Sequence, residues 1–147
     1  LTQVGNQNDD GFLTASEVMG MKLDADMVVL SACQTGLGKM VKGEGVMGLS
    51  RAFMSSGTNS IVVSLWPVAS SSTTELMKYF YRHLKEGKTK GEALRLAKKD
   101  LRGKAYNISE GRGVKIIASS KDQQKEIKID ASHPFFWSPF ILVGEWR

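Results

Sequence analysis

Cys33 is the only cysteine in the 147 residues, and it stands at a place suited to chemistry. It directly follows the apolar run at residues 27–32 and directly precedes Gln34-Thr-Gly-Leu-Gly38. A thiol at the point where a buried strand gives way to a glycine-rich loop lies where open α/β sheets place their active sites. Free cysteine is also among the most buried residue types, so this position fits a nucleophile and a core thiol alike.

Other motifs that could bind a metal or a nucleotide fit less well. Residues 6–17 match the spacing of a calcium loop, but the first position is Asn6 and no helix precedes it. The glycine-rich loop has Val41 where a dinucleotide fingerprint requires glycine, and Lys39 lacks the Walker spacing. Residues 48–52 only approximate a serine nucleophile elbow and fall in a predicted helix. We therefore expect no metal and no other cofactor.

The rest of the sequence predicts the elements that must position Cys33. Three apolar runs predict strands: 27–32, 60–66 and 140–143. Three capping boxes predict helix starts: Thr14, Ser72 and Thr89. A further helix is predicted between the first two strands, with Gly57 at its end. Strands alternating with helices predict an α/β fold with helices on both faces of the sheet.

Residues 103–132 differ in character from this pattern. Residues 114–118 and 126–130 alternate weakly and are separated by a polar stretch. This predicts a β-hairpin or a mobile insertion.

Composition narrows the class of protein. A chain of this length fits one domain, a single cysteine rules out an internal disulfide, and the compartment we expect is the cytoplasm. No run approaches the ~18 apolar residues of a membrane span.

The net charge is +5, but acidic residues interrupt the basic ones at 78–104 and no aromatic stacking pattern accompanies them. A solvated helix face is favoured over a nucleic-acid interface. The polar start at Leu1 suggests a piece of a longer protein.

Several separate motifs occur in one order along the chain. They are Val28-Val-Leu-Ser-Ala-Cys-Gln-Thr-Gly-Leu-Gly38, Gly43-Glu-Gly-Val46, Arg51-Ala-Phe53, Val63-Ser-Leu-Trp-Pro-Val68 and His133-Pro with Trp137-Ser-Pro-Phe140. This series resembles the CHAT domain, a caspase-like peptidase domain often found beside tetratricopeptide repeats. The resemblance runs nearly end to end, so residues 1–147 are interpreted as a single, partial CHAT domain.

The resemblance implies a caspase-like α/β/α sandwich with a mainly parallel central sheet. It implies that Cys33 is the nucleophile of a Cys-His dyad and that its own N–H binds the oxyanion. Ser31 is implied to line the specificity pocket. The resemblance also implies that an extended protein or peptide substrate pairs with Ser64, Leu65, Trp66, Pro67 and Val68. Trp66 fits a core aromatic at a strand end equally well.

The chain departs from the family pattern in two places. Residues 69–71 read Ala-Ser-Ser where the family usually has acidic residues, which puts a preference for basic substrate side chains in doubt. The dyad histidine of the family lies upstream of Leu1, so it would come from a missing N-terminal half or from a companion chain made by processing. His83 falls inside a predicted helix, and His133 is a weak candidate base. The chain alone is expected to be inactive.

A second hypothesis belongs to another class. A catalytically silent caspase-like module would bind partners and transmit a signal, with Cys33 kept as part of the core. The parent protein is expected to carry a tetratricopeptide-repeat region in either case. Neither hypothesis includes a membrane or direct nucleic-acid binding.

Overall fold

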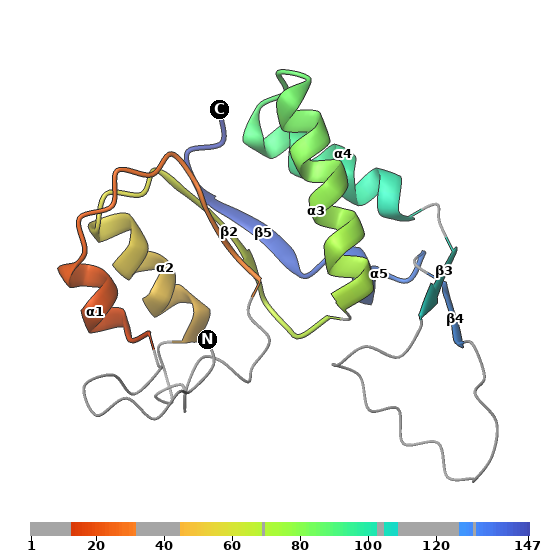
Figure 1. The fold of residues 1–147 in the computed structure, drawn as a ribbon, viewed down its shortest axis with the longest axis horizontal. Coiled ribbons are helices and arrows are strands. Elements are labelled where there is room, and N and C mark those ends of the chain that lie inside the picture. Colours follow the sequence, from red (N-terminus) through yellow and green to blue (C-terminus); the bar gives the residue numbers. More distant parts are fainter. Residues whose placement is uncertain (1–12, 32–44, 69, 103–104, 109–126, 131) are drawn as a thin grey trace, which may run out of the picture. The chain divides into compact units, whose positions relative to one another are not determined.

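The computed structural model describes residues 13–31, 45–68, 70–102, 105–108, 127–130 and 132–147. The chain forms two compact units (Figure 1). The first comprises Leu1–Pro67 with Phe140–Trp146, and the second comprises Val68–Pro139 with Arg147. Each unit is described below by itself.

The first unit contains a three-stranded sheet in the order β1-β2-β5. Strand β1 (Val28–Leu30) pairs in parallel with β2 (Ser60–Ser64), and β2 pairs antiparallel with β5 (Phe140–Gly144). The central strand β2 is buried along its whole length, as expected for an apolar strand with neighbours on both sides. Parallel pairing across a helical connection is compatible with the predicted α/β class, although only one of the two described strand pairs in this sheet is parallel.

Two helices of the first unit pack on each other, α1 (Ala15–Gly20) and α2 (Gly45–Ser55). Their core combines Val18 from α1 and two α2 residues, Ala52 and Phe53, with Ile61 and Val63 from β2. The two β2 residues are two positions apart, so they point to the same face of the sheet. This face of the sheet is therefore closed by apolar packing.

The capping box predicted at Thr14 is confirmed. The Glu17 N–H donates to the Thr14 hydroxyl at 3.3 Å, and the Glu17 carboxylate accepts from the Thr14 N–H at 2.6 Å. Two of the amide groups that a helix start leaves without partners are thereby satisfied.

Gly57 ends α2 as predicted and lies in the left-handed region, with φ +103°. A Cβ built there would meet the carbonyl oxygen of Leu23, which is backbone and cannot move aside cheaply. Gly57→Ala is therefore expected to lower the free energy of unfolding by at least about 2 kcal/mol. Chemical denaturation measures this change.

Gly87→Ala is the matched control for that substitution. Gly87 also has a positive φ, +79°, but a Cβ there meets nothing within 4 Å. We expect it to cost only about 1 kcal/mol, from backbone strain alone. Equal losses in the two variants would show that the contact with Leu23 contributes nothing.

The second unit is built on two helices that pack along each other, α3 (Ser70–Lys85) and α4 (Lys90–Arg102). Their buried residues include Leu76, Phe80, Ala93, Leu94, Ala97 and Leu101. The turn between them passes through Gly87, where the Lys88 N–H donates to the carbonyl of His83 at 3.1 Å. The short helix α5 (Pro134–Trp137) contacts both.

One predicted helix start is confirmed and another is wrong. Helix α4 begins after Thr89, whose hydroxyl accepts from the Glu92 N–H at 3.3 Å, as the third capping box predicts. Helix α3 begins at Ser70, so Ser72 is a buried residue inside the helix and not its cap. The run of serines and threonines at 70–74 offers several equivalent capping side chains, and the pattern alone selected the wrong one.

Strand boundaries differ from the predictions by one or two residues. Described pairing in β1 stops at Leu30, and β2 stops at Ser64, before Leu65 and Trp66. In the region 103–132, β3 (Ala105–Ile108) pairs antiparallel with β4 (Ile127–Asp130). The strand predicted at 126–130 thus corresponds to β4, but β3 was not predicted. Residues 114–118 lie outside the described part of the chain.

No helix in the described part of the chain is both long enough and apolar enough to span a bilayer.

Candidate functional site

The carboxyl ends of β1 and β2 meet at one edge of the sheet, because the two strands are parallel. Leu30 pairs in register with Val63, so the next residues, Ser31 and Ser64, follow at neighbouring positions. We name the set Ser31, Ser64, Leu65, Trp66 and Pro67 the carboxyl edge. The roles predicted for these residues in substrate binding stay predictions.

The side chains of the carboxyl edge differ in exposure. Ser31 is exposed, whereas Ser64 is buried and its hydroxyl donates to the carbonyl of Trp66 at 2.6 Å. This bond ties the chain into a bend directly after β2. Leu65 is 45% exposed, Trp66 is half-buried and Pro67 is exposed. Half-burial of Trp66 leaves both of its predicted roles open, as a core aromatic and as a contact for substrate.

Two predicted site residues remain, Cys33 and Val68. Cys33, with the N–H expected to bind an oxyanion, lies outside the described residues. Val68 belongs to the second unit and is buried there. The assignments of nucleophile and substrate contacts therefore stay predictions.

The calcium interpretation of residues 6–17 can be examined only at its last position. The Glu17 carboxylate accepts both from the N–H of Thr14 and from its hydroxyl, at 2.6 and 2.8 Å. Its capping role accounts for this acidic residue. Among the described residues, no group of three His, Cys, Asp or Glu side chains could hold a metal ion.

His83 is a hydrogen-bonded helix residue, as predicted. It is buried on α3, with Nε2 2.9 Å from an Asp100 carboxylate oxygen on α4 and Nδ1 3.0 Å from a Glu86 carboxylate oxygen. The Arg82 guanidinium lies 2.6 Å from the same Asp100 oxygen. These four side chains link the two helices, which gives His83 a structural role within the second unit.

The sequence analysis did not identify this cluster, and the spacing of its members explains why. Glu86 lies three residues after His83, a separation that places two helical side chains on one face. Asp100 lies seventeen residues away on another helix, and only the packing of α3 on α4 brings it to the imidazole. No local signal could have identified that contact.

His133 has a capping role. It stands before α5, and its Nδ1 accepts from the Phe135 N–H at 3.2 Å. Its ring also meets Phe136 edge-on, with 6.5 Å between centroids. Its Nδ1 therefore serves to cap the helix in this geometry.

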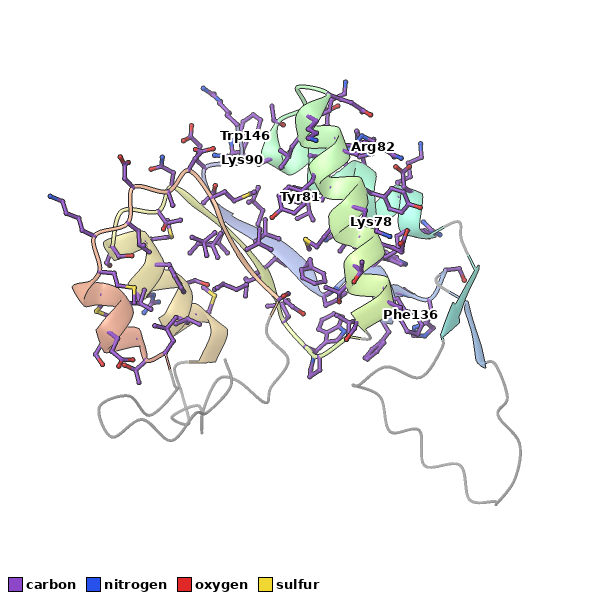
Figure 2. The ribbon with its side chains drawn as sticks, viewed as in Figure 1. Lys78, Tyr81, Arg82, Lys90, Phe136 and Trp146 are labelled. Carbon is purple, nitrogen blue, oxygen red and sulfur yellow. The ribbon has the colours of Figure 1, made fainter. Side chains whose placement is uncertain are left out.

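Basic side chains of the second unit are in part paired with acids of the same helices. Lys78 lies 2.6 Å from Glu75, a hydrogen bond that raises the pKa of this exposed lysine, and Arg82 pairs with Asp100. Figure 2 shows Lys78 and Arg82 projecting from the same side of α3. Such pairing is typical of a solvated helix face, the interpretation favoured from the sequence.

Lys98 on α4 is an exception to this pattern. Burial lowers its pKa, because the charged form loses hydration, and none of the described side chains forms an ion pair with it. Between that lowered pKa and its ordinary value of 10.5, the unfolded chain binds more protons than the folded one. Stability from this group therefore rises with pH through that window.

Lys98→Met is accordingly expected to stabilise the protein. The methionine keeps the packing of the stem and removes the partly buried charge, so the free energy of unfolding should rise at pH 7, by less than about 1 kcal/mol because solvent screens a half-exposed charge. The difference in stability between Lys98→Met and the parent should become smaller as pH approaches 10.5, since a neutral lysine loses little hydration free energy on burial. The exposed Lys99→Met is the matched control. Thermal denaturation at pH 7 and pH 10 measures both, and an equal shift in the two variants would contradict the argument.

Comparison with known proteins assigns this chain to a family. Residues 1–145 match the model of the CHAT domain. Tetratricopeptide repeat protein 28 of Homo sapiens is 32% identical over 132 residues, which is 90% of this chain and 4% of that protein. The protein of the same name in Mus musculus is 30% identical over 132 residues, with the same coverage. The chain thus spans about 4% of the length of these relatives.

No solved structure matches the chain. The family match covers almost every residue, and it includes both the carboxyl edge and the segment that carries Cys33. The chain therefore belongs to the CHAT domain family.

Proposed function

We propose that this chain is the cysteine-bearing part of a caspase-like cysteine endopeptidase domain. The observation that carries the proposal is the parallel pairing of β1 with β2, because it sets the carboxyl ends of both strands side by side. Cys33 follows β1 by three residues, so the chain leads from that edge directly to the thiol. Family membership supports the same assignment and a caspase-like α/β/α sandwich.

In the proposed reaction, the histidine, the Cys33 thiol and the backbone N–H groups each have one role. A histidine from outside this chain takes the proton of the Cys33 thiol, because a thiol with an ordinary pKa of about 8.5 is mostly protonated at neutral pH. The thiolate attacks the carbonyl carbon of a peptide bond, and backbone N–H groups bind the oxyanion. The amine leaves with the proton, and water then hydrolyses the thioester.

Supply of the histidine from another segment agrees with the local roles of both imidazoles in this chain. His83 is held between two carboxylates, and His133 caps α5. Along the carboxyl edge, an extended substrate would pair through its backbone with the segment after β2. Such pairing gives affinity from main-chain hydrogen bonds and leaves specificity to side chains.

An electrophilic peptide probe tests the proposal on the full-length protein. The expected result is covalent labelling of one residue, and peptide mapping by mass spectrometry should place it on Cys33. Substitution of the upstream histidine by alanine should slow labelling, because less thiolate is present. Labelling that persists in the Cys33→Ala protein would remove the claim.

A second candidate function is a catalytically silent module that binds a partner. The structural roles of His83 and His133 favour it, since the described part of the chain then offers no base. The names of the relatives also point to repeat proteins, whose stacked repeats form binding surfaces. A histidine in the parent sequence, at the end of the strand that precedes residue 1, would count against this alternative.

A further inference from the structure

Charged side chains in the first unit are unevenly placed between the two ends of its sheet. Three of the described ones, Lys22, Asp24 and Asp26, come just before β1, and the bridge between Ala25 and Thr58 fixes this segment beside the start of β2. A hydroxyl of β2 confirms the position: Ser60 donates to the carbonyl of Asp26 at 2.8 Å. These charges therefore lie at the amino end of the parallel strands.

Glu145 lies at the same end. Strand β5 runs antiparallel to β2, and its last residue, Gly144, pairs with Ser60 at the start of β2. Glu145 is the next residue along the chain. The Glu145 N–H donates to the carbonyl of Asn59 at 3.0 Å, which fixes that placement. Four of the six charged residues described in this unit are thus gathered away from the carboxyl edge.

The other two charged residues belong to the helices. The Glu17 carboxylate is engaged with Thr14 in the capping box of α1. Arg51 is exposed on α2, next to Ala52 and Phe53, which face the core. Neither residue is a member of the carboxyl edge.

The carboxyl edge itself carries no charged side chain among the residues that the structure describes. It presents a small neutral hydroxyl, Ser31, beside three successive apolar residues, Leu65, Trp66 and Pro67. Leu65 is 45% exposed although it directly follows the fully buried strand β2. An exposed apolar residue at this place would gain by being covered, because water is then released from both surfaces.

We infer that the substrate residues next to the scissile bond are uncharged and apolar, and that Leu65 selects them. This inference rests on the proposed peptidase function. A charged side chain brought against Leu65 and Trp66 would lose water without gaining a partner of opposite charge from the described edge. An aliphatic side chain would instead bury apolar surface on both sides.

Matched activity probes test this inference on the full-length protein. Four acyloxymethyl ketone peptides differ only in the residue before the reactive group, which is glycine, leucine, arginine or aspartate. The thiolate attacks the methylene carbon and displaces the carboxylate, so the second-order rate of labelling reports recognition. We expect the leucine probe to label Cys33 at least about tenfold faster than the arginine or aspartate probe. An arginine or aspartate probe that is equal or faster would overturn the inference.

The same experiment separates the two levels of the argument. If no probe labels Cys33, the glycine probe included, the proposed peptidase function fails and the inference fails with it. If Cys33 is labelled but the charged probes lead, the peptidase function survives and only the apolar preference is lost.

Variants of Leu65 provide an independent measurement. Leu65→Asp should slow the leucine probe at least about tenfold and accelerate the arginine probe, since it places a carboxylate at the edge. Leu65→Met should retain both rates within about threefold. Met54→Asp is the matched control, because Met54 is a similarly exposed apolar residue (40%) on α2 of the same unit and should leave the ratio of rates unchanged. An unchanged ratio in Leu65→Asp, with circular dichroism showing a folded protein, would contradict the role of Leu65.

Discussion

Replacement of Cys33 by alanine in the full-length protein is expected to reduce peptide hydrolysis by at least about a thousandfold. Without the sulfur no thioester forms, and only binding and oxyanion stabilisation remain to accelerate the attack of water. The measurement is kcat/KM for a fluorogenic peptide that the unsubstituted protein cleaves. The loss should appear in kcat, because alanine removes the reacting atom and leaves the substrate contacts in place.

Two further variants show whether such a loss is chemical. Cys33→Ser should also lose nearly all activity, because a hydroxyl is a much weaker nucleophile beside a base adapted to a thiol. Ser55→Ala, at the exposed end of α2 in the same unit, should keep the activity of the parent. Hydrolysis that continues in Cys33→Ala at the parent rate would favour the silent-module hypothesis or assign the reaction to a contaminant.

Phe80→Ala is expected to produce the largest loss of stability. Phe80 is fully buried on α3, where it is among the largest enclosed side chains. Truncation removes its transfer free energy and leaves a cavity, so the free energy of unfolding should fall by about 3–5 kcal/mol. Urea denaturation followed by circular dichroism measures the change.

Tyr81→Ala is the matched control, because it removes a ring from the next position of the same helix. Tyr81 is 48% exposed, and its ring lies 5.5 Å from that of Phe80. We expect a loss of about 1 kcal/mol, chiefly from this ring pair. Similar losses in both variants would show that the interior of the second unit is not tightly packed around Phe80.

Elements with strong local signals could be predicted from the sequence. The run at residues 61–63 is apolar and β-branched, Pro67 follows shortly after it, and it forms the centre of the buried strand β2. Thr14 and Thr89 each combine a hydroxyl with a glutamate three residues later, and both precede helices. These predictions succeeded because each depends on neighbours within one turn of the chain.

Contacts between distant segments could not be predicted in the same way. The antiparallel position of β5 beside β2 and the contact of Asp100 with His83 depend on tertiary packing. That β1 and β2 end at the same edge of the sheet could be expected from the sequence, because parallel strands bring their carboxyl ends together. The exposure of Leu65 could not be predicted, since the pattern of an apolar residue after a buried strand indicates that the strand continues.

Phe140 and Ser64 are register partners, although residues 65–139 separate them along the chain. The polypeptide therefore leaves the sheet and returns to it at one place, and residues 65–139 connect the ends of two adjacent strands. A segment whose two ends lie side by side can change in length at little entropic cost to the strands that hold its ends. Lengthening an exposed turn between Ser64 and Phe140 would then leave the alignment of the three strands unchanged.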